Sequence, residues 1–290
     1  MMKPGIMVIG HGSREPDWVA RVDRTVDATR ERLNEPASLA GLGLTEPVPV
    51  VAAYLELVEG RLIQDGVNAL EALGVTDIVA VPLFVSSGST HVDEIGWALG
   101  AYETPRRETD LERIAVRARL SYGRPIGGDP EIADALLDKL AGVERADASE
   151  AEGGGGAGDP GIADALLLIG HGSDEPWFHE AWRAELESLV SELMSRGGYG
   201  DAETAMLRPD EVAARVGLLR ARRPGARVIA VPVFLSEGYF TSEAIPRRLA
   251  GLDCVYAEGA LLPHARIGDW IVRRASEGLA DIKRAAGDSR

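Results

Sequence analysis

Cysteine is almost absent from this chain, since Cys254 is the only one among 290 residues. A single thiol can neither form a disulfide within the chain nor supply a cluster of thiolate metal ligands. Long hydrophobic runs are missing too, and none approaches the roughly 20 apolar residues that a membrane-spanning helix needs. The apolar run at 6–9 is too short for a signal peptide. We therefore expect a cytoplasmic protein with no membrane partner.

Positive charge is scarce. The chain has 31 basic and 46 acidic residues, which gives a formal net charge of −15. Such a balance argues against a nucleic-acid partner or an anionic membrane surface, because both would require a basic face. Residues 10–15 lack the third glycine of a dinucleotide fingerprint, and no Walker lysine is present, so we expect no ATP site.

The chain contains two copies of one pattern. The pentapeptide Ile-Gly-His-Gly-Ser occurs at 9–13 and again at 169–173. A second pair of segments, 80–88 and 230–238, is identical at six of nine positions. A repeat this long indicates duplicated domains rather than a solenoid, whose repeats span roughly 20–50 residues.

Short β-branched runs alternate with helical patterns in both halves. Strands are predicted at 5–10, 48–55, 77–84, 113–119, 165–170, 201–207, 226–234 and 252–257. Helices are predicted near 16–33, 60–73, 92–102, 130–142, 177–195, 210–222, 243–250 and 266–283. Alternating βα units imply an α/β fold with parallel sheets and right-handed crossovers.

A glycine-rich stretch separates the two halves. We expect domains at 1–145 and 161–290, joined by a flexible linker at 146–160 that contains four consecutive glycines. The helix near 130–142 leaves an alternative open, because it could cross and pack on the other half. The boundary in space would then differ from the boundary in sequence.

Three side chains of the first half follow predicted strands. They are His11, Glu56 and His91. Ligands of open parallel sheets bind beyond the carboxyl ends of the strands, so these side chains are candidates for one site. Two imidazoles and a carboxylate suit a divalent metal such as Co, Fe, Ni or Zn, and they can also accept protons near neutral pH. Each residue alone could be structural; their joint placement favours function.

These segments resemble a known family. Ile-Gly-His-Gly-Ser-Arg at 9–14, Ala-Tyr-Leu-Glu-Leu at 53–57 and Val-Pro-Leu-Phe at 81–84, followed by Gly88 and His91, are similar to the sirohydrochlorin chelatases, class II cobalt- or ferrochelatases of the CbiX/SirB type. The resemblance covers essentially the whole chain. It implies two tandem flavodoxin-like, chelatase-like domains that face one another across a cleft, with the metal site in the first.

The resemblance also implies roles for individual residues. His11 and His91 would bind the incoming metal, and Glu56 would assist and take the pyrrole protons. Asp93 and Glu94 would relay those protons away. No cofactor is implied beyond the substrate metal, which is Co²⁺, Fe²⁺ or Ni²⁺.

The second half departs from this pattern. His171 is kept, but alignment puts Thr241 where His91 stands and Arg208 where Glu56 stands. We therefore expect a degenerate second site in which Arg208 binds a substrate carboxylate. Further candidates for substrate binding are Ser13, Arg14 and Ser89, with Arg106 and Arg124 as additional arginines near strand ends.

The favoured hypothesis is a lyase of cobalamin or siroheme biosynthesis that inserts a divalent metal into sirohydrochlorin without ATP and acts as a monomer. The alternative is a non-catalytic carrier of a metal or a tetrapyrrole. A serine hydrolase built on Ser13 or Ser89 is disfavoured, because neither serine lies in a Gly-x-Ser-x-Gly turn.

Overall fold

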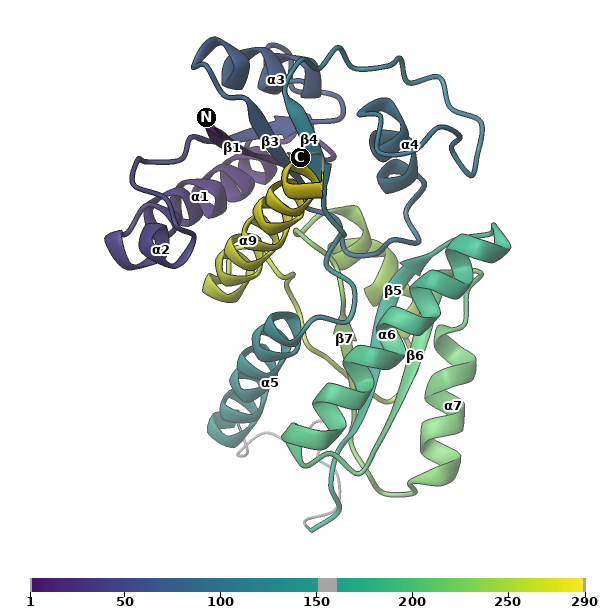
Figure 1. Ribbon diagram of the computed structural model, residues 1–290. Coiled ribbons are helices and arrows are strands. Elements are labelled where there is room, and N and C mark those ends of the chain that lie inside the picture. Colours follow the sequence, from purple (N-terminus) through teal and green to yellow (C-terminus); the bar gives the residue numbers. More distant parts are fainter. Residues whose placement is uncertain (1, 151–160, 289–290) are drawn as a thin grey trace. The chain divides into compact units, whose positions relative to one another are not determined.

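The computed structural model describes residues 2–150 and 161–288, with the backbone alone at 144–150 and 286–288. The chain forms two compact units (Figure 1). Unit 1 consists of Met1–Ile126 together with Pro263–Arg290, and unit 2 consists of Gly127–Leu262. Each unit contains a four-stranded sheet in which all strand pairs are parallel.

Unit 1 has its strands in the order β2-β1-β3-β4. The strands are β1 (Pro4–Gly10), β2 (Val50–Tyr54), β3 (Asp77–Pro82) and β4 (Arg119–Tyr122). The helices are α1 (Pro16–Leu33), α2 (Pro36–Gly41), α3 (Ile63–Ala72), α4 (Thr90–Ala98) and α9 (Ala265–Asp288).

Helices cover both faces of this sheet. Met7 and Ile9 of β1 share a buried apolar cluster with Val67 of α3 and Ile95 of α4. On the opposite face α9 runs beside α1 and contacts β3 and β4 (Figure 1). Because β1 is enclosed from both sides, all seven of its residues are buried, which explains its continuous apolar sequence.

Unit 2 repeats the arrangement with the order β6-β5-β7-β8. The strands are β5 (Ala165–Gly172), β6 (Asp201–Arg208), β7 (Val228–Pro232) and β8 (Val255–Tyr256). The helices are α5 (Pro130–Glu150), α6 (Pro176–Gly197), α7 (Val212–Arg222), a π-helical turn η1 (Phe240–Ala244) and α8 (Ile245–Leu249). Helices α7 and α8 share one apolar cluster with the sheet, whereas α6 contacts β5 and β6 and also packs against α5.

The predicted fold class is confirmed. Two α/β units with parallel sheets are present, and the 2-1-3-4 strand order is that of flavodoxin-like folds. The predicted strand at 113–119 is wrong, because β4 begins only at Arg119. The preceding segment is extended but does not join the sheet. Its backbone amides at Ala115 and Arg117 donate instead to side chains of α3, namely Gln64 at 2.8 Å and Glu71 at 2.6 Å.

The compact units differ from the expected domains, whose boundaries were placed at 145 and 161, because each half of the sequence contributes one helix to the other unit. Helix α5 precedes the glycine-rich stretch but belongs to unit 2, and α9 lies at the end of the second half but belongs to unit 1. Residues 146–150, expected to begin the linker, continue α5. The rest of the expected linker, 151–160, lies outside the described residues.

Two short elements were not predicted. Helix α2 has six residues, too few to leave a helical periodicity in the sequence. The π-helical turn η1 gives no hydrophobic pattern of its own, and its effect appears only at the site described below. Among the helices of the described ranges, none is both long and apolar enough to cross a bilayer.

The close approach of α9 to β3 yields a stability prediction. A Cβ atom at Gly278 of α9 would overlap Cγ1 of Val79, whereas one at Gly268 of the same helix would lie 3.5 Å from Thr29 Oγ1, an ordinary contact. We expect Gly278→Ala to lower the free energy of unfolding by about 1–3 kcal/mol through overpacking.

The matched variant Gly268→Ala should leave stability unchanged or raise it by up to about 1 kcal/mol, the usual gain from replacing a helical glycine. Thermal unfolding followed by circular dichroism measures both. Equal gains for the two variants would contradict the packing of α9 on the sheet of unit 1.

Candidate active site

The turn after β1 places His11 beside the end of β2. Gly10 and Tyr54 are paired at the ends of the two strands, and the Glu56 amide donates to the His11 carbonyl oxygen at 3.1 Å. Gly12 has a φ of 99°, and a Cβ atom there would overlap the Glu56 carbonyl oxygen. Only glycine permits both features. The Gly-His-Gly turn therefore brings His11 and Glu56 together.

The two ring nitrogens of His11 have different partners. Nδ1 lies 3.0 Å from the carbonyl oxygen of Gly12, which can only accept, so Nδ1 carries the proton of the neutral ring. Nε2 keeps its lone pair and lies 3.7 Å from Oε1 of Glu56. Two ligands of one metal ion, each at about 2.1 Å from it, are roughly 3–3.5 Å apart. The pair is thus arranged to share a cation or a proton.

His91 comes to the same place from α4. Its ring centroid lies 4.6 Å from that of His11, with the ring planes 79° apart. Its Nδ1 is 2.6 Å from Oε1 of Glu94, and because a carboxylate only accepts, this nitrogen is the donor. A carboxylate that holds one ring nitrogen fixes the orientation of the imidazole and leaves Nε2 for a ligand.

Glu94 is itself held in place. Its second carboxylate oxygen accepts a hydrogen bond from the Thr109 hydroxyl at 2.8 Å. The hydrogen bond from His91 lowers the pKa of Glu94 and outweighs the opposing effect of partial burial. Glu94 therefore stays ionised and remains an acceptor for His91. Thr109 was not predicted, and its distance in sequence from His91 left no pattern to find it by.

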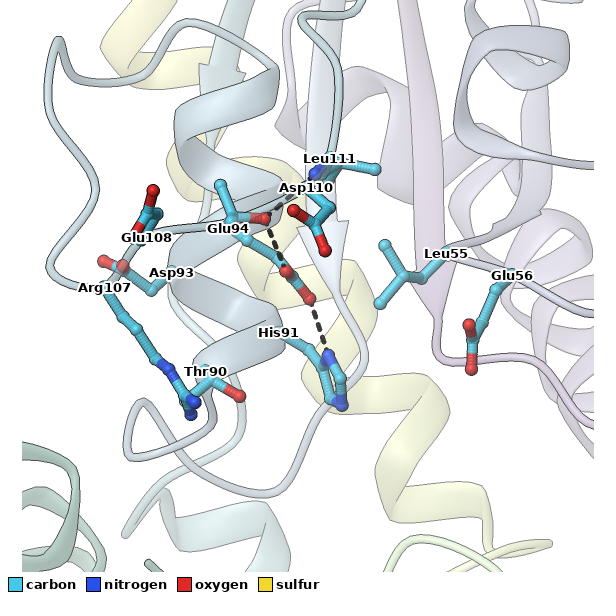
Figure 2. Close-up of a pocket in the computed structure, with 11 residues that line it drawn as sticks. Leu55, Glu56, Thr90, His91, Asp93, Glu94, Arg107, Glu108, Asp110 and Leu111 are labelled. Carbon is cyan, nitrogen blue, oxygen red and sulfur yellow. Dashed lines mark hydrogen bonds and ion pairs between the residues drawn. The ribbon is translucent and has the colours of Figure 1, made fainter. Parts of the chain in front are cut away.

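A pocket of about 480 Å³ opens between α4, the end of β2 and the segment 107–111 (Figure 2). Figure 2 shows His91 bonded to Glu94 within it, with Glu56 presented by the neighbouring strand end. Its walls carry the carboxyl groups of Glu56, Asp93, Glu94, Glu108 and Asp110 against the single guanidinium of Arg107. This excess of carboxylates makes the pocket attractive to cations.

Asp93 was expected to relay protons, but it holds a loop. The residue is only 7% exposed. One carboxylate oxygen accepts from the backbone amide of Arg106 at 2.7 Å, and the other accepts from the Tyr102 hydroxyl at 3.2 Å. These bonds fasten the segment that carries the far wall of the pocket.

The other predicted residues of the first half lie at the same sheet edge. The Ser13 hydroxyl accepts from the Glu15 amide at 3.0 Å and so closes the turn after β1. Arg14 and Arg124 are exposed. Ser89 is the extended N-cap residue of α4, two positions before His91. Substrate binding by these residues remains a prediction.

Unit 2 repeats the turn but not the candidate metal ligands. His171 Nδ1 lies 2.9 Å from the carbonyl oxygen of Gly172, as His11 does from Gly12. The ring that meets His171 edge-to-face, at a centroid distance of 4.8 Å, is Phe240. A phenyl ring replaces the second imidazole, so this pair lacks a second metal ligand.

The alignment of Thr241 with His91 is therefore wrong by one residue. In unit 1 the Tyr122 hydroxyl donates to the carbonyl oxygen of Val92, and in unit 2 the Tyr256 hydroxyl donates to that of Thr241, both at 2.8 Å. Thr241 thus matches Val92, and Phe240 matches His91. The sequence repeat matches Tyr239 to Ser89, but Tyr239 is already helical whereas Ser89 is extended. The helical conformation thus begins one residue earlier in unit 2, and the wider π-helical turn η1 takes up the extra residue.

Strand register agrees with the alignment of Arg208 to Glu56. A Cβ atom at Gly172 would overlap the Arg208 carbonyl oxygen, as one at Gly12 would overlap that of Glu56. Arg208 forms an exposed ion pair of 2.6 Å with Asp174. Asp174 follows its Gly-Ser turn at the position of Arg14, so the signs of both charges are inverted between the units.

A hydrogen-bonded cluster of Asp23, Tyr54 and Arg61, called the Asp23 clasp below, supports the loop that carries Glu56 and was not predicted. Asp23 of α1 accepts from the Tyr54 hydroxyl at 2.9 Å and from the Arg61 guanidinium at 2.9 and 2.5 Å. Between those two partners Leu57 adopts a φ of 67°, a strained conformation for leucine. The clasp holds both ends of the strained loop.

Across residues 2–150 and 161–288, no group of three or more His, Cys, Asp or Glu side chains has the geometry of a complete metal site. His11, His91 and Glu56 come close together but form an incomplete ligand set.

The CbiX family model matches the chain twice, over residues 5–143 and 165–278. The chain belongs to the CbiX family. Each match takes in most of one exchanged helix, α5 or α9, so the family pattern follows the halves of the sequence rather than the compact units. The suspected resemblance is confirmed.

Similar curated proteins carry chelatase names. A sirohydrochlorin cobaltochelatase of Methanothermobacter thermautotrophicus is 24% identical over 144 residues, which is 48% of this chain and 91% of that protein. A sirohydrochlorin ferrochelatase of Bacillus subtilis is 29% identical over 179 residues, 60% of this chain and 53% of that protein.

Two solved structures of SirB share the fold. SirB from Bacillus subtilis with Fe³⁺ has a TM-score of 0.69 at 21% identity and covers 97% of this chain and 98% of its own. SirB from Bacillus subtilis subspecies spizizenii in complex with cobalt has a TM-score of 0.65 at 18% identity, with 97% of each chain covered.

The Asp23 clasp yields a prediction with a definite pH dependence. Burial would raise the pKa of Asp23, but hydrogen bonds from Arg61 and Tyr54 outweigh it and lower that pKa. The clasp therefore contributes stability above the unfolded pKa of about 3.9 and loses it as pH falls through the lower folded pKa. Asp23→Asn should cost about 1 kcal/mol at pH 7, because Arg61 is partly solvent-screened.

The deficit of Asp23→Asn should shrink below about pH 4. Melting temperatures from pH 3 to 7 measure it, with Asp17→Asn in the exposed first turn of α1 as the control. A deficit that stays constant with pH would argue against a charged clasp.

Proposed function

We propose that this CbiX-family protein inserts Co²⁺ or Fe²⁺ into sirohydrochlorin without ATP. The observation that carries the proposal is the meeting of His11, His91 and Glu56 at one sheet edge, with the Nδ1 atom of each imidazole already committed to an acceptor. The reaction exchanges one divalent cation for both pyrrole N–H protons. It therefore needs a metal holder and a proton acceptor in the same place.

The imidazoles supply the metal holder. Nε2 of His11 and Nε2 of His91 keep lone pairs for a borderline cation. An incomplete ligand set suits a metal in transit, because open coordination positions let the pyrrole nitrogens bind before the histidines release. A complete tetrahedral protein site would instead retain the metal as a structural ion.

Glu56 supplies the proton acceptor. Its side chain is 55% exposed, and its Oε1 lies beside the lone-pair nitrogen of His11. As the metal enters the macrocycle, Glu56 takes the two pyrrole protons one after the other and passes each to water or to the carboxylates of the pocket. Glu94 differs in role, since its hydrogen bond to His91 orients the imidazole.

Arg208 in unit 2 binds a carboxylate of the substrate. The guanidinium is 59% exposed and donates to Asp174 through Nη2, which leaves further N–H groups for a second carboxylate. Ser13, Arg14 and Ser89 line the corresponding edge of unit 1 and bind polar substituents. Both halves stand in one polypeptide, so the protein acts as a monomer.

A carrier that binds the metal or the tetrapyrrole without turnover is the second candidate. The same histidine pair favours it, because metal binding alone needs no proton acceptor. Absorption spectra of sirohydrochlorin with Co²⁺ or Fe²⁺, taken with and without the protein, separate the two. An enzyme accelerates the spectral change at catalytic concentrations, whereas a carrier alters it only in proportion to its own amount.

Histidine substitutions in the two units should have different effects on the rate of metal insertion. We expect His11→Ala and His91→Ala each to lower the insertion rate by about 100-fold or more, the usual scale for losing an acid–base or ligand group. At saturating sirohydrochlorin, His171→Ala should change it by less than about threefold, because Phe240 gives His171 no second ligand. Equal losses at His11 and His171 would assign the chemistry to both units.

Glu56 and Arg208 should affect different kinetic constants. Glu56→Gln removes a group that acts only while protons move, so kcat should fall at nearly constant KM. Arg208→Ala removes a contact made in the ground state, so KM should rise by about 10-fold at nearly constant kcat.

The control for Arg208 is Asp174→Asn, which keeps the guanidinium and removes its partner, and it should leave KM unchanged or lower it. Steady-state rates at saturating and limiting sirohydrochlorin measure all three variants. A loss of kcat at constant KM in Arg208→Ala would refute carboxylate binding by this arginine.

A further inference from the structure

Unit 2 presents a stack of aromatic rings at its carboxyl sheet edge. Phe240 meets His171 edge-to-face at 4.8 Å and stacks on Phe234 at 5.7 Å with the planes 25° apart. Tyr239 meets Phe240 at 5.5 Å and is 55% exposed. The stack therefore begins in the half-buried core of the unit and ends in an open ring.

This stack stands where unit 1 has its histidine pair. The hydrogen bonds of Tyr122 and Tyr256 match Phe240 to His91, and the two Gly-His-Gly turns match His171 to His11. The phenyl ring of Phe240 has no lone pair for a divalent cation, but phenyl and phenol rings both offer flat faces and polarised edges to another conjugated ring. At this edge an aromatic stack therefore takes the place of the second imidazole.

The backbone conformation of unit 2 at this edge differs from that of unit 1 and holds the aromatic rings in place. Tyr239 is already helical, with φ −45° and ψ −42°, whereas the N-cap residue Ser89 of α4 is extended, with φ −91° and ψ 127°. The π-helical turn that follows Tyr239 places Phe240 over His171 and Tyr239 outside it. Such turns frequently occur at functional sites.

We propose that Tyr239, Phe240 and His171 form a binding surface for the conjugated face of the tetrapyrrole, an inference that rests on the proposed function. Arg208 lies at the same sheet edge as the stack, because it pairs in the β5–β6 register with Gly172, the residue after His171. Aromatic rings beside an exposed guanidinium match a flat macrocycle with anionic substituents. A second protein copy fits less well, because a stable dimer buries about 800 Å² per partner and one open ring supplies about 200 Å² at most.

The test compares variants at the exposed ring. Metal-free sirohydrochlorin is titrated into the full-length protein, and the shift of its absorption bands gives Kd. Tyr239→Ala should raise Kd and KM by about 3- to 10-fold and leave kcat at saturation intact. Tyr239→Phe keeps the ring and should bind as the wild type does. The matched control is Leu218→Ala, an apolar side chain of α7 that is 45% exposed, and it should also bind normally.

The outcomes separate this surface from the proposed activity. Unchanged Kd in Tyr239→Ala overturns the surface, even where the wild type inserts metal. A Tyr239-dependent Kd in a protein that inserts no metal supports the surface and refutes the enzyme. Unchanged Kd together with loss of a dimer in sedimentation velocity also overturns it, and assigns the ring to self-association.

Discussion

The site depends on how closely two neighbouring strand ends can pass. Where the turn after β1 runs against the end of β2, the position of Gly12 has no room for a side chain, because the Glu56 carbonyl oxygen occupies that space. This contact sets the distance between the imidazole of His11 and the carboxylate that it faces. Unit 2 has the same constraint between Gly172 and Arg208. The two units therefore share the backbone conformation of this turn, although the side chain at the end of the neighbouring strand is a glutamate in one and an arginine in the other.

Duplication has preserved that backbone conformation while its side chains diverged. An exposed arginine and a glutamate in unit 1 correspond to an aspartate and an arginine in unit 2, and an imidazole corresponds to a phenyl ring. These changes leave unit 2 without the counterparts of Glu56 and His91 and place a guanidinium and a phenyl ring at that edge. The strand order is the same in both units.

Much of the fold and of the site could be predicted from the sequence because its signals are local. The Gly-His-Gly turns and the buried strands each lie within a few residues, and parallel strands bring their carboxyl ends to one edge. Features set by distant partners could not be read in this way. The Asp23 clasp joins residues far apart in the chain. Phe240, and not Thr241, matches His91 because a π-helical turn shifts the register by one residue. Residues 113–118 stay outside the sheet because side chains of α3 accept hydrogen bonds from two of their backbone amides.

The exchange of α5 and α9 sets an order of events during synthesis. A ribosome makes all of Gly127–Leu262 before it makes α9, so unit 2 has its full complement of helices first. Until α9 emerges, the part of the unit 1 sheet that α9 contacts, mainly β3 and β4, lacks its cover on that face. The nascent chain thus completes unit 1 last, although it begins that unit first. A polypeptide interrupted before α9 would leave the ribosome with this part of the sheet uncovered, a state that chaperones and proteases recognise.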